Sequence, residues 1–159
     1  MNQLILDFFI HARMSWFDPV VVVFTEITGP TLMFVYALVW AVVRKEWSVP
    51  VAVGVANVLS HFLKKVFEHP RPDSSIHLVE ETNFSLPSGH AVGAAAFAVA
   101  CGFFLRTLWK TLLALLALMV GISRLYVGVH WPSDVLVGWA IGALVALVVV
   151  TSWNCLQRR

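Results

Sequence analysis

Long apolar stretches make up most of this chain, and they constrain its fold more than any other feature. A helix needs about 20 residues to cross the hydrocarbon core of a bilayer, with a range of roughly 17 to 25. Five stretches approach that length: 30–44, 48–67, 89–106, 109–129 and 133–153. Charged residues make up only 13% of the chain, against roughly 25% in an ordinary soluble domain. The sequence therefore predicts an all-α bundle of membrane-spanning helices.

The first 29 residues are harder to assign. The segment 17–29 continues toward the first of the five stretches, but Gly29 and Pro30 are expected to break or kink a helix there. We therefore expect residues 1–29 to form a surface helix or a partial span, which gives about five to six spans in all. The chain has 159 residues, about the size of one domain, so residues 1–159 are predicted to form a single integral membrane domain.

Basic residues distinguish the two sides of this arrangement. Those in or beside the short loops fall on one common side: Arg44, Lys45, Arg106, Lys110, Arg158 and Arg159. Lysine and arginine are enriched in loops that stay in the cytoplasm. We therefore expect that side to be cytoplasmic. The segment 68–88 and the turn near residue 130 are then expected to face the periplasm or the cell exterior, as in a bacterial inner-membrane protein.

Two classes of function gain no support from the composition. The formal net charge is only +2, and no basic arm or patch is visible, so nucleic-acid binding is not expected. The two cysteines, Cys101 and Cys155, show no CxxC spacing and no cluster with histidine. The sequence therefore predicts neither a disulfide framework nor a zinc site.

Three polar segments interrupt the apolar pattern, and all three are predicted to lie on the outer side. They are KKVFEHPRP at 64–72, PSGH at 87–90 and SRLYVGVHWPSD at 123–134. Lys64, Arg71 and Arg124 together would form a cluster of positive charge that favours an anion. The planar fork of arginine matches phosphate oxygens, and lysine adds a point charge. The predicted ligand is therefore a phosphate group.

The PSGH segment supports the same prediction. Pro87 can start a helix whose free N–H groups point at a bound anion, with Ser88 and Gly89 at the helix start. Glycine at this position lets the backbone approach the ligand closely. His90 then lies in the first turn, where its imidazole can exchange a proton with the bound group.

A second histidine precedes the last apolar stretch. His130 is followed four residues later by Asp134, and a carboxylate that accepts the Nδ1 proton leaves Nε2 free as a nucleophile. One histidine can then attack phosphorus while the other protonates the departing oxygen. The positive side chains can neutralise the developing charge, so we expect no metal ion and no other cofactor.

The three segments, taken in this order, resemble the three motifs of the type 2 phosphatidic acid phosphatase (PAP2) family. The matches are KxxxxxxRP at 64–72, PSGH at 87–90 and SRxxxxxHxxxD at 123–134, separated by 14 and 32 residues. The resemblance covers roughly residues 48–145. It implies an all-helical membrane bundle of the type shared with vanadium-dependent haloperoxidases.

The resemblance also implies a role for each residue of the motifs. His130 is the nucleophile, Asp134 is its orienting carboxylate, and His90 is the acid that protonates the leaving group. Five residues are expected to hold the phosphoryl oxygens: Lys64, Arg71, Ser88, Gly89 and Arg124. One position departs from the pattern, because His69 precedes PRP where many relatives resemble RPRP.

The expected function is therefore that of a membrane lipid phosphatase. By resemblance, its substrates would be lipids of the undecaprenyl pyrophosphate, phosphatidylglycerol phosphate or phosphatidic acid class. Two alternatives stay open. One is a phosphotransferase that passes the phosphoryl group from His130 to a lipid or sugar hydroxyl. The other is a non-catalytic module that binds or transports a lipid phosphate.

Several polar residues outside the motifs receive structural interpretations. Asn57, His61 and Lys64 lie at helical spacing and are expected to form one polar stripe facing the bundle interior. For His61 we expect a hydrogen bond between helices. Glu80 and Glu81 are interpreted as a solvated face of a loop.

Overall fold

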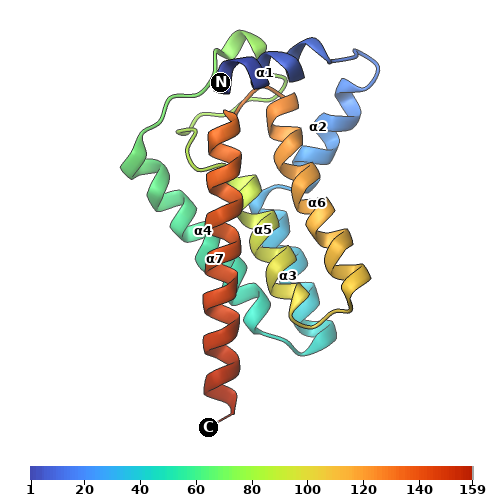
Figure 1. Ribbon diagram of the computed structural model, residues 1–159, viewed down its shortest axis with the longest axis vertical. Coiled ribbons are helices and arrows are strands. Elements are labelled where there is room, and N and C mark those ends of the chain that lie inside the picture. Colours follow the sequence, from blue (N-terminus) through green and yellow to red (C-terminus); the bar gives the residue numbers. More distant parts are fainter. Residues whose placement is uncertain (159) are drawn as a thin grey trace.

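The computed structural model describes residues 1–158, and over this range seven α-helices and one short 3-10 helix form an elongated bundle (Figure 1). The helices are α1 (Asn2–His11), α2 (Asp18–Ile27), α3 (Pro30–Arg44), α4 (Ser48–Phe67), η1 (Ser74–Ile76), α5 (Gly89–Gly102), α6 (Thr107–Tyr126) and α7 (Pro132–Gln157). The predicted all-α membrane bundle is confirmed. Arg159, one of the basic residues used to predict the topology, lies outside the described residues.

Three helices are long and apolar enough to cross a membrane by themselves, namely α4, α6 and α7. Together α2 and α3 are long and apolar enough for a fourth span if the pair is counted as one, and the pair is bent by 54° where Gly29 and Pro30 separate the two helices. The predicted break is thus confirmed, and α2 belongs either to a broken span or to a re-entrant loop. The other N-terminal helix, α1, lies across one end of the bundle (Figure 1).

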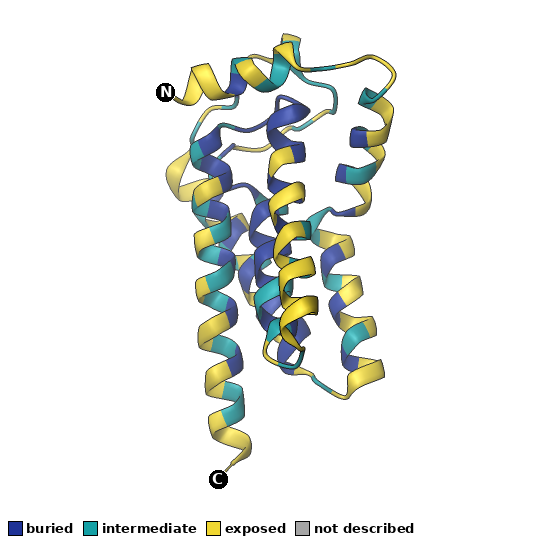
Figure 2. Ribbon diagram, turned by 45° about the vertical axis from the view of Figure 1, so that its right-hand side comes forward, coloured by how far each residue is buried: buried dark blue, intermediate teal, exposed yellow. Residues whose placement is uncertain are grey.

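The third predicted stretch, 89–106, is shorter than expected. It forms α5, which has 14 residues and ends at Gly102 rather than at 106. This helix lies at the centre of the bundle, where most of its residues are buried (Figure 2). Because α3, α4, α6 and α7 surround it, α5 serves as the internal support for the residues at its N-terminus.

Small residues let α7 lie directly against α5. A Cβ atom added at Gly142 would lie 2.2 Å from the carbonyl oxygen of Val92. One added at Gly138 would lie 2.8 Å from the carbonyl oxygen of Ser88. Side chains at these two positions would therefore force the helices apart. Their absence fixes the start of α7 against the start of α5.

Apolar side chains cover the outside of the bundle, as expected for a protein whose solvent is lipid. Large exposed residues of this kind occur on every long helix, for example Val43, Phe62, Leu112 and Leu144. His61 is also exposed on the outer surface of α4. The prediction that His61 forms a hydrogen bond between helices is therefore wrong. At 100° per residue the inward face of α4 passes through Ser60 and Lys64, and His61 lies beyond its edge.

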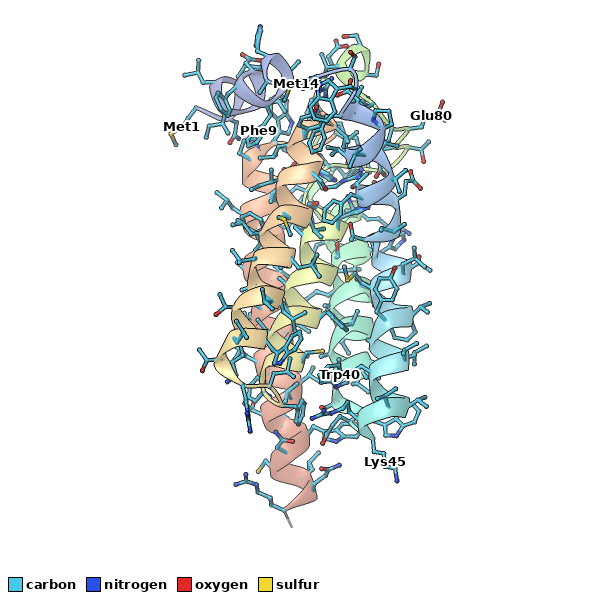
Figure 3. All side chains as sticks on the ribbon, turned by 90° about the vertical axis from the view of Figure 1, so that its right-hand side faces the viewer. Met1, Phe9, Met14, Trp40, Lys45 and Glu80 are labelled. Carbon is cyan, nitrogen blue, oxygen red and sulfur yellow. The ribbon has the colours of Figure 1, made fainter. Side chains whose placement is uncertain are left out.

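The segments that the sequence analysis placed on opposite sides of the membrane lie at opposite ends of the bundle. Lys45 lies at one end, and Glu80 and Met14 lie at the other (Figure 3). The loop between α4 and α5, which carries Glu80, is thus separated from the basic α3–α4 turn by the length of the bundle. The assignment of the two ends to the cytoplasm and the exterior stays a prediction.

Candidate active site

The polar residues of the three segments meet at the end of the bundle where α4 and α6 finish and where α5 and α7 begin. Two prolines set these beginnings, since Pro87 precedes the α5 cap Ser88 and Pro132 occupies the first position of α7. A turn at Gly128 leads from α6 toward α7. Gly128 has a φ of 80°, and a Cβ there would lie 2.6 Å from the carbonyl oxygen of Ile76, so the turn requires glycine.

His130 and Asp134 form a buried pair at the start of α7. The Nδ1 atom of His130 lies 3.4 Å from Oδ2 of Asp134. The same oxygen accepts a hydrogen bond of 2.9 Å from the backbone N–H of Trp131, as an acidic residue in the first turn of a helix commonly does. The carboxylate is therefore fixed by the backbone that it caps, and it faces the imidazole from a fixed position.

Ser85 is a third member of this pair that the sequence interpretation missed. Its hydroxyl lies 3.2 Å from Nδ1 of His130 and donates a hydrogen bond to Oδ2 of Asp134. The residue is completely buried. The only signal in the sequence was a serine two positions before PSGH, in a loop where serine is ordinary.

Arg71 contacts the opposite side of the His130 ring. Its Nη1 atom lies 3.3 Å from Nε2 of His130 and donates a hydrogen bond of 2.7 Å to the carbonyl oxygen of Val129. A guanidinium carries only donors, so in this contact Nε2 is the acceptor and we assign the ring proton to Nδ1. The Nδ1–H then faces Asp134, and the lone pair of Nε2 faces the arginine.

The charge state of His130 agrees with this assignment. Burial lowers the pKa of His130 well below its usual range, and the positive charges of Arg124 and Arg71 lower it further. The imidazole is therefore neutral at pH 7 when no ligand is bound. A neutral ring is the form that has a free lone pair.

Lys64 lies in the last turn of α4 and is only 8% exposed. Its ammonium group donates hydrogen bonds to the carbonyl oxygens of Phe84 and, at 3.3 Å, Ser85. Lys64 therefore anchors the chain that leads into PSGH, besides adding positive charge near the arginines.

Arg124 is almost fully buried near the end of α6, with 1% of its surface exposed. Its Nη1 atom donates a 2.7 Å hydrogen bond to the hydroxyl of Thr25 in α2. Its Nη2 atom forms an ion pair with Glu81. The other oxygen of Glu81 lies 3.2 Å from Nη2 of Arg71, so one carboxylate bridges both arginines.

This bridge corrects the interpretation of Glu81 as part of a solvated face. Its neighbour Glu80 is exposed, as expected, but Glu81 is largely enclosed. The pattern of two adjacent acidic residues does not reveal which of them turns inward. That choice depends on Arg124, which lies 43 positions further along the chain.

His90 lies in the first turn of α5, close to the break between α2 and α3. It lines a cavity of about 260 Å³ together with residues that include Gly29, Pro30, Glu81 and Arg124. The cavity therefore connects the imidazole of His90 with the guanidinium of Arg124.

The start of α5 presents the features of an anion site. Ser88 is fully buried, and its hydroxyl has no hydrogen-bond partner within residues 1–158. Gly89 follows, and a Cβ there would lie 3.4 Å from the ring of Pro30. The free N–H groups of the first turn and the unpaired hydroxyl can bind oxygen atoms of an anion.

His69, the position that departs from the usual motif, also lies at the site. Its Nδ1 atom is 3.4 Å from Oδ1 of Asp134, and its side chain is 39% exposed. Asp134 is thus approached by two imidazoles, one buried and one open to solvent.

Comparisons with known proteins agree with this geometry. The family model of the PAP2 superfamily matches residues 45–158. A phosphatidylglycerophosphatase B of Bacillus subtilis (strain 168) is 34% identical over 119 residues, which are 67% of this chain and 58% of that protein. An undecaprenyl-diphosphatase of Sulfolobus acidocaldarius is 36% identical over 102 residues, which are 60% of this chain and 49% of that protein. The chain thus spans about half to three-fifths of the length of these curated relatives.

Solved structures share the fold over nearly the whole chain. A transmembrane PAP2 type phosphatidylglycerolphosphate phosphatase from Bacillus subtilis superimposes with a TM-score of 0.83 at 28% identity, covering 96% of this chain and 84% of that chain. Aquifex aeolicus LpxE superimposes with a TM-score of 0.84 at 24% identity, covering 94% of both chains. The family model and the shared fold lead to one conclusion: this chain belongs to the PAP2 superfamily.

Proposed function

We propose that this chain is a membrane lipid phosphatase that hydrolyses a phosphomonoester or a pyrophosphate of a lipid through a phosphohistidine intermediate. One observation carries the proposal, namely the set of contacts around His130. Its Nδ1 lies against Ser85 and Asp134, while its Nε2 faces Arg71. A neutral imidazole held in this way directs a nucleophilic lone pair at the place where arginines bind phosphate oxygens.

In the first step, Nε2 of His130 attacks phosphorus and forms a P–N bond while the bond from phosphorus to the leaving oxygen breaks. Asp134 stabilises the positive charge that develops on the ring. Lys64, Arg71 and Arg124 stabilise the negative charge on the phosphoryl oxygens. The N–H groups at the start of α5, beside Ser88 and Gly89, bind the same oxygens.

His90 transfers the proton in both steps. A phosphate dianion bound beside His90 favours its protonated form, and the imidazolium gives its proton to the leaving oxygen. The product is the lipid alcohol when the substrate is a phosphomonoester and the lipid monophosphate when it is a pyrophosphate. In the second step, water attacks phosphorus and gives a proton back to His90, and the P–N bond breaks. Inorganic phosphate is released, and both histidines return to their starting states.

The substrate class rests on the relatives and on the shape of the molecule. The names of the matched relatives refer to phosphatidylglycerophosphate, undecaprenyl diphosphate and decaprenylphosphoryl-5-phosphoribose. Each of these substrates is a lipid that carries a terminal phosphate or diphosphate group. The site lies at one end of an apolar bundle, so the lipid tail can stay in the bilayer while the phosphate reaches His130.

Phosphate release by purified protein in detergent, measured with a panel of lipid phosphates, tests this function. Rapid quenching with a labelled substrate should trap label on the protein in an acid-labile, base-stable form, which is the behaviour of phosphohistidine. Without release from any member of the panel, hydrolysis would have to be abandoned. Label that moves to an added alcohol instead of water would identify a phosphotransferase.

The proposal places the enzyme in a bacterial-type cytoplasmic membrane with the site facing the periplasm or the exterior. It is supported by the basic residues in the α3–α4 and α5–α6 turns, which lie at the end of the bundle opposite the site (Figure 1). A cysteine at Ser75 should react with an impermeant thiol reagent in cells whose outer barrier is open, whereas one at Thr107 should not. The exposed native Cys155 is first replaced by serine. The reverse labelling pattern would invert the topology.

A further inference from the structure

Glu81 occupies the position between the two arginines that the proposed function assigns to the phosphate. Its Oε1 pairs with Nη2 of Arg124, and its Oε2 lies 3.2 Å from Nη2 of Arg71. A carboxylate and a phosphate present similar pairs of oxygen atoms to guanidinium groups. The same donors cannot serve both anions at once.

Each arginine is held in place by other partners as well. Arg71 donates hydrogen bonds to the carbonyl oxygen of Asn83 at 2.7 Å, to its side-chain oxygen at 2.6 Å and to the carbonyl oxygen of Val129. Arg124 donates to Thr25 and is enclosed by the bundle. Each guanidinium therefore keeps at least one other hydrogen-bond partner when Glu81 withdraws.

Glu81 itself is able to leave this position. It lies in the irregular segment between η1 and α5, and its side chain keeps 19% of its surface exposed. It also borders the cavity of about 260 Å³ that contains His90. A side chain on a loop beside a cavity can withdraw without disturbing a helix.

We propose that Glu81 is an internal ligand that occupies the anion site and must be displaced by the phosphate of the substrate. This inference rests on the proposed function. A terminal phosphomonoester or a pyrophosphate carries about two or more negative charges, whereas the phosphodiester of an ordinary phospholipid carries one. Glu81 competes most effectively with the singly charged group. It therefore selects lipids with a terminal phosphate from a membrane that is full of phosphodiesters.

Binding of inorganic phosphate separates this role from a purely structural one. If Glu81 competes for the site, Glu81→Gln should lower the Kd of inorganic phosphate by about tenfold, since a charged hydrogen-bonded competitor has been removed. If Glu81 is instead a strut that positions the arginines, the same change should raise the Kd. Calorimetry on the full chain in detergent measures this binding without any turnover.

Glu80→Gln is the matched control. It removes the same charge from the adjacent position of the same loop. Glu80 also borders the cavity, but its exposed side chain points outward (Figure 3) and pairs with neither Arg71 nor Arg124 within residues 1–158. The Kd of inorganic phosphate for Glu80→Gln should stay at the wild-type value. Glu81→Asp keeps the charge on a shorter side chain that cannot bridge both arginines, so it should lower the Kd by less than Glu81→Gln. This variant provides the test if Glu81→Gln does not fold.

Selectivity gives a second measurement. Inhibition of hydrolysis by vesicles of the phosphodiester phosphatidylglycerol should become stronger in Glu81→Gln, and the KM for a lipid phosphomonoester should fall. An unchanged or raised Kd for phosphate overturns the inference, even if the wild type is an active phosphatase. An inactive wild type whose phosphate affinity still rises in Glu81→Gln would refute the proposed function and keep Glu81 as the competing anion.

Discussion

The site combines residues on helices with residues on the loop 68–88, and the two groups contribute to it in different ways. His90 belongs to α5, and Arg124 and Asp134 belong to α6 and α7, which pack against α5. The positions of these three residues follow from the packing of the helices. Arg71 and Glu81 belong to the loop, and their positions follow from hydrogen bonds between polar groups. Under the two proposals made above, the helices fix where the chemistry occurs, while the loop sets which anions enter.

The largest effect is expected on the helix side, at the nucleophile. His130→Ala should reduce kcat by several orders of magnitude, because within residues 1–158 no other imidazole has its Nδ1 against a carboxylate while its Nε2 faces Arg71. The thermal unfolding temperature should stay close to that of the wild type. His61→Ala is the control, since His61 is exposed on the outer surface of α4 and should retain full activity. Near-normal turnover by His130→Ala would remove this residue from the mechanism.

A smaller effect is expected where the loop supports the nucleophile. Ser85→Ala removes the hydroxyl that contacts both His130 and Asp134, and it should lower kcat roughly 10- to 100-fold while changing KM little. Ser85→Thr, which restores a hydroxyl, should recover much of this loss. Ser48 is also fully buried, but it begins α4, whose other end lies at the site, so Ser48→Ala should be neutral. Equal losses in Ser85→Ala and Ser85→Thr would assign Ser85 to packing alone.

The packing of α7 against α5 tests the framework rather than the chemistry. Gly142→Ala adds a Cβ 2.2 Å from the carbonyl oxygen of Val92, so α7 must move away from α5. We expect a loss of about 1–3 kcal/mol in stability and a few-fold loss of activity, measured by thermal unfolding and phosphate release. Gly102→Ala is the control, because its nearest neighbour, Lys110, would be 3.8 Å from the new atom. If both variants unfold alike, close approach at Gly142 is not what positions the site.

The same contrast between helices and loop explains what the sequence could predict. Apolar length and the break at Gly29–Pro30 located the helices, because both depend on local residues. The three motifs located the end of the bundle that carries the candidate site, since their residues lie at or beside helix termini. The roles of Ser85 and Glu81 depend on partners 49 and 43 positions away, and a loop has no periodicity to reveal which side chain turns inward. His61 was misassigned because spacing alone did not define the edge of the buried face.

The smallest expected effect concerns divalent metal, and it tests whether both groups of residues together supply all the charge that the reaction needs. Lys64 and Arg124 come from helices and Arg71 comes from the loop, and each lies close enough to His130 to lower its pKa. Three cations of this kind can neutralise a phosphoryl group in its transition state. Exhaustive treatment with EDTA should therefore leave kcat unchanged.

The informative comparison is Arg71→Lys, which keeps the charge but loses the planar fork. Its activity should be reduced and should be equally insensitive to EDTA. If EDTA abolished wild-type activity and magnesium restored it, Lys64, Arg71 and Arg124 would not suffice to neutralise the phosphoryl group. The site would then include a metal ion besides its helix and loop residues.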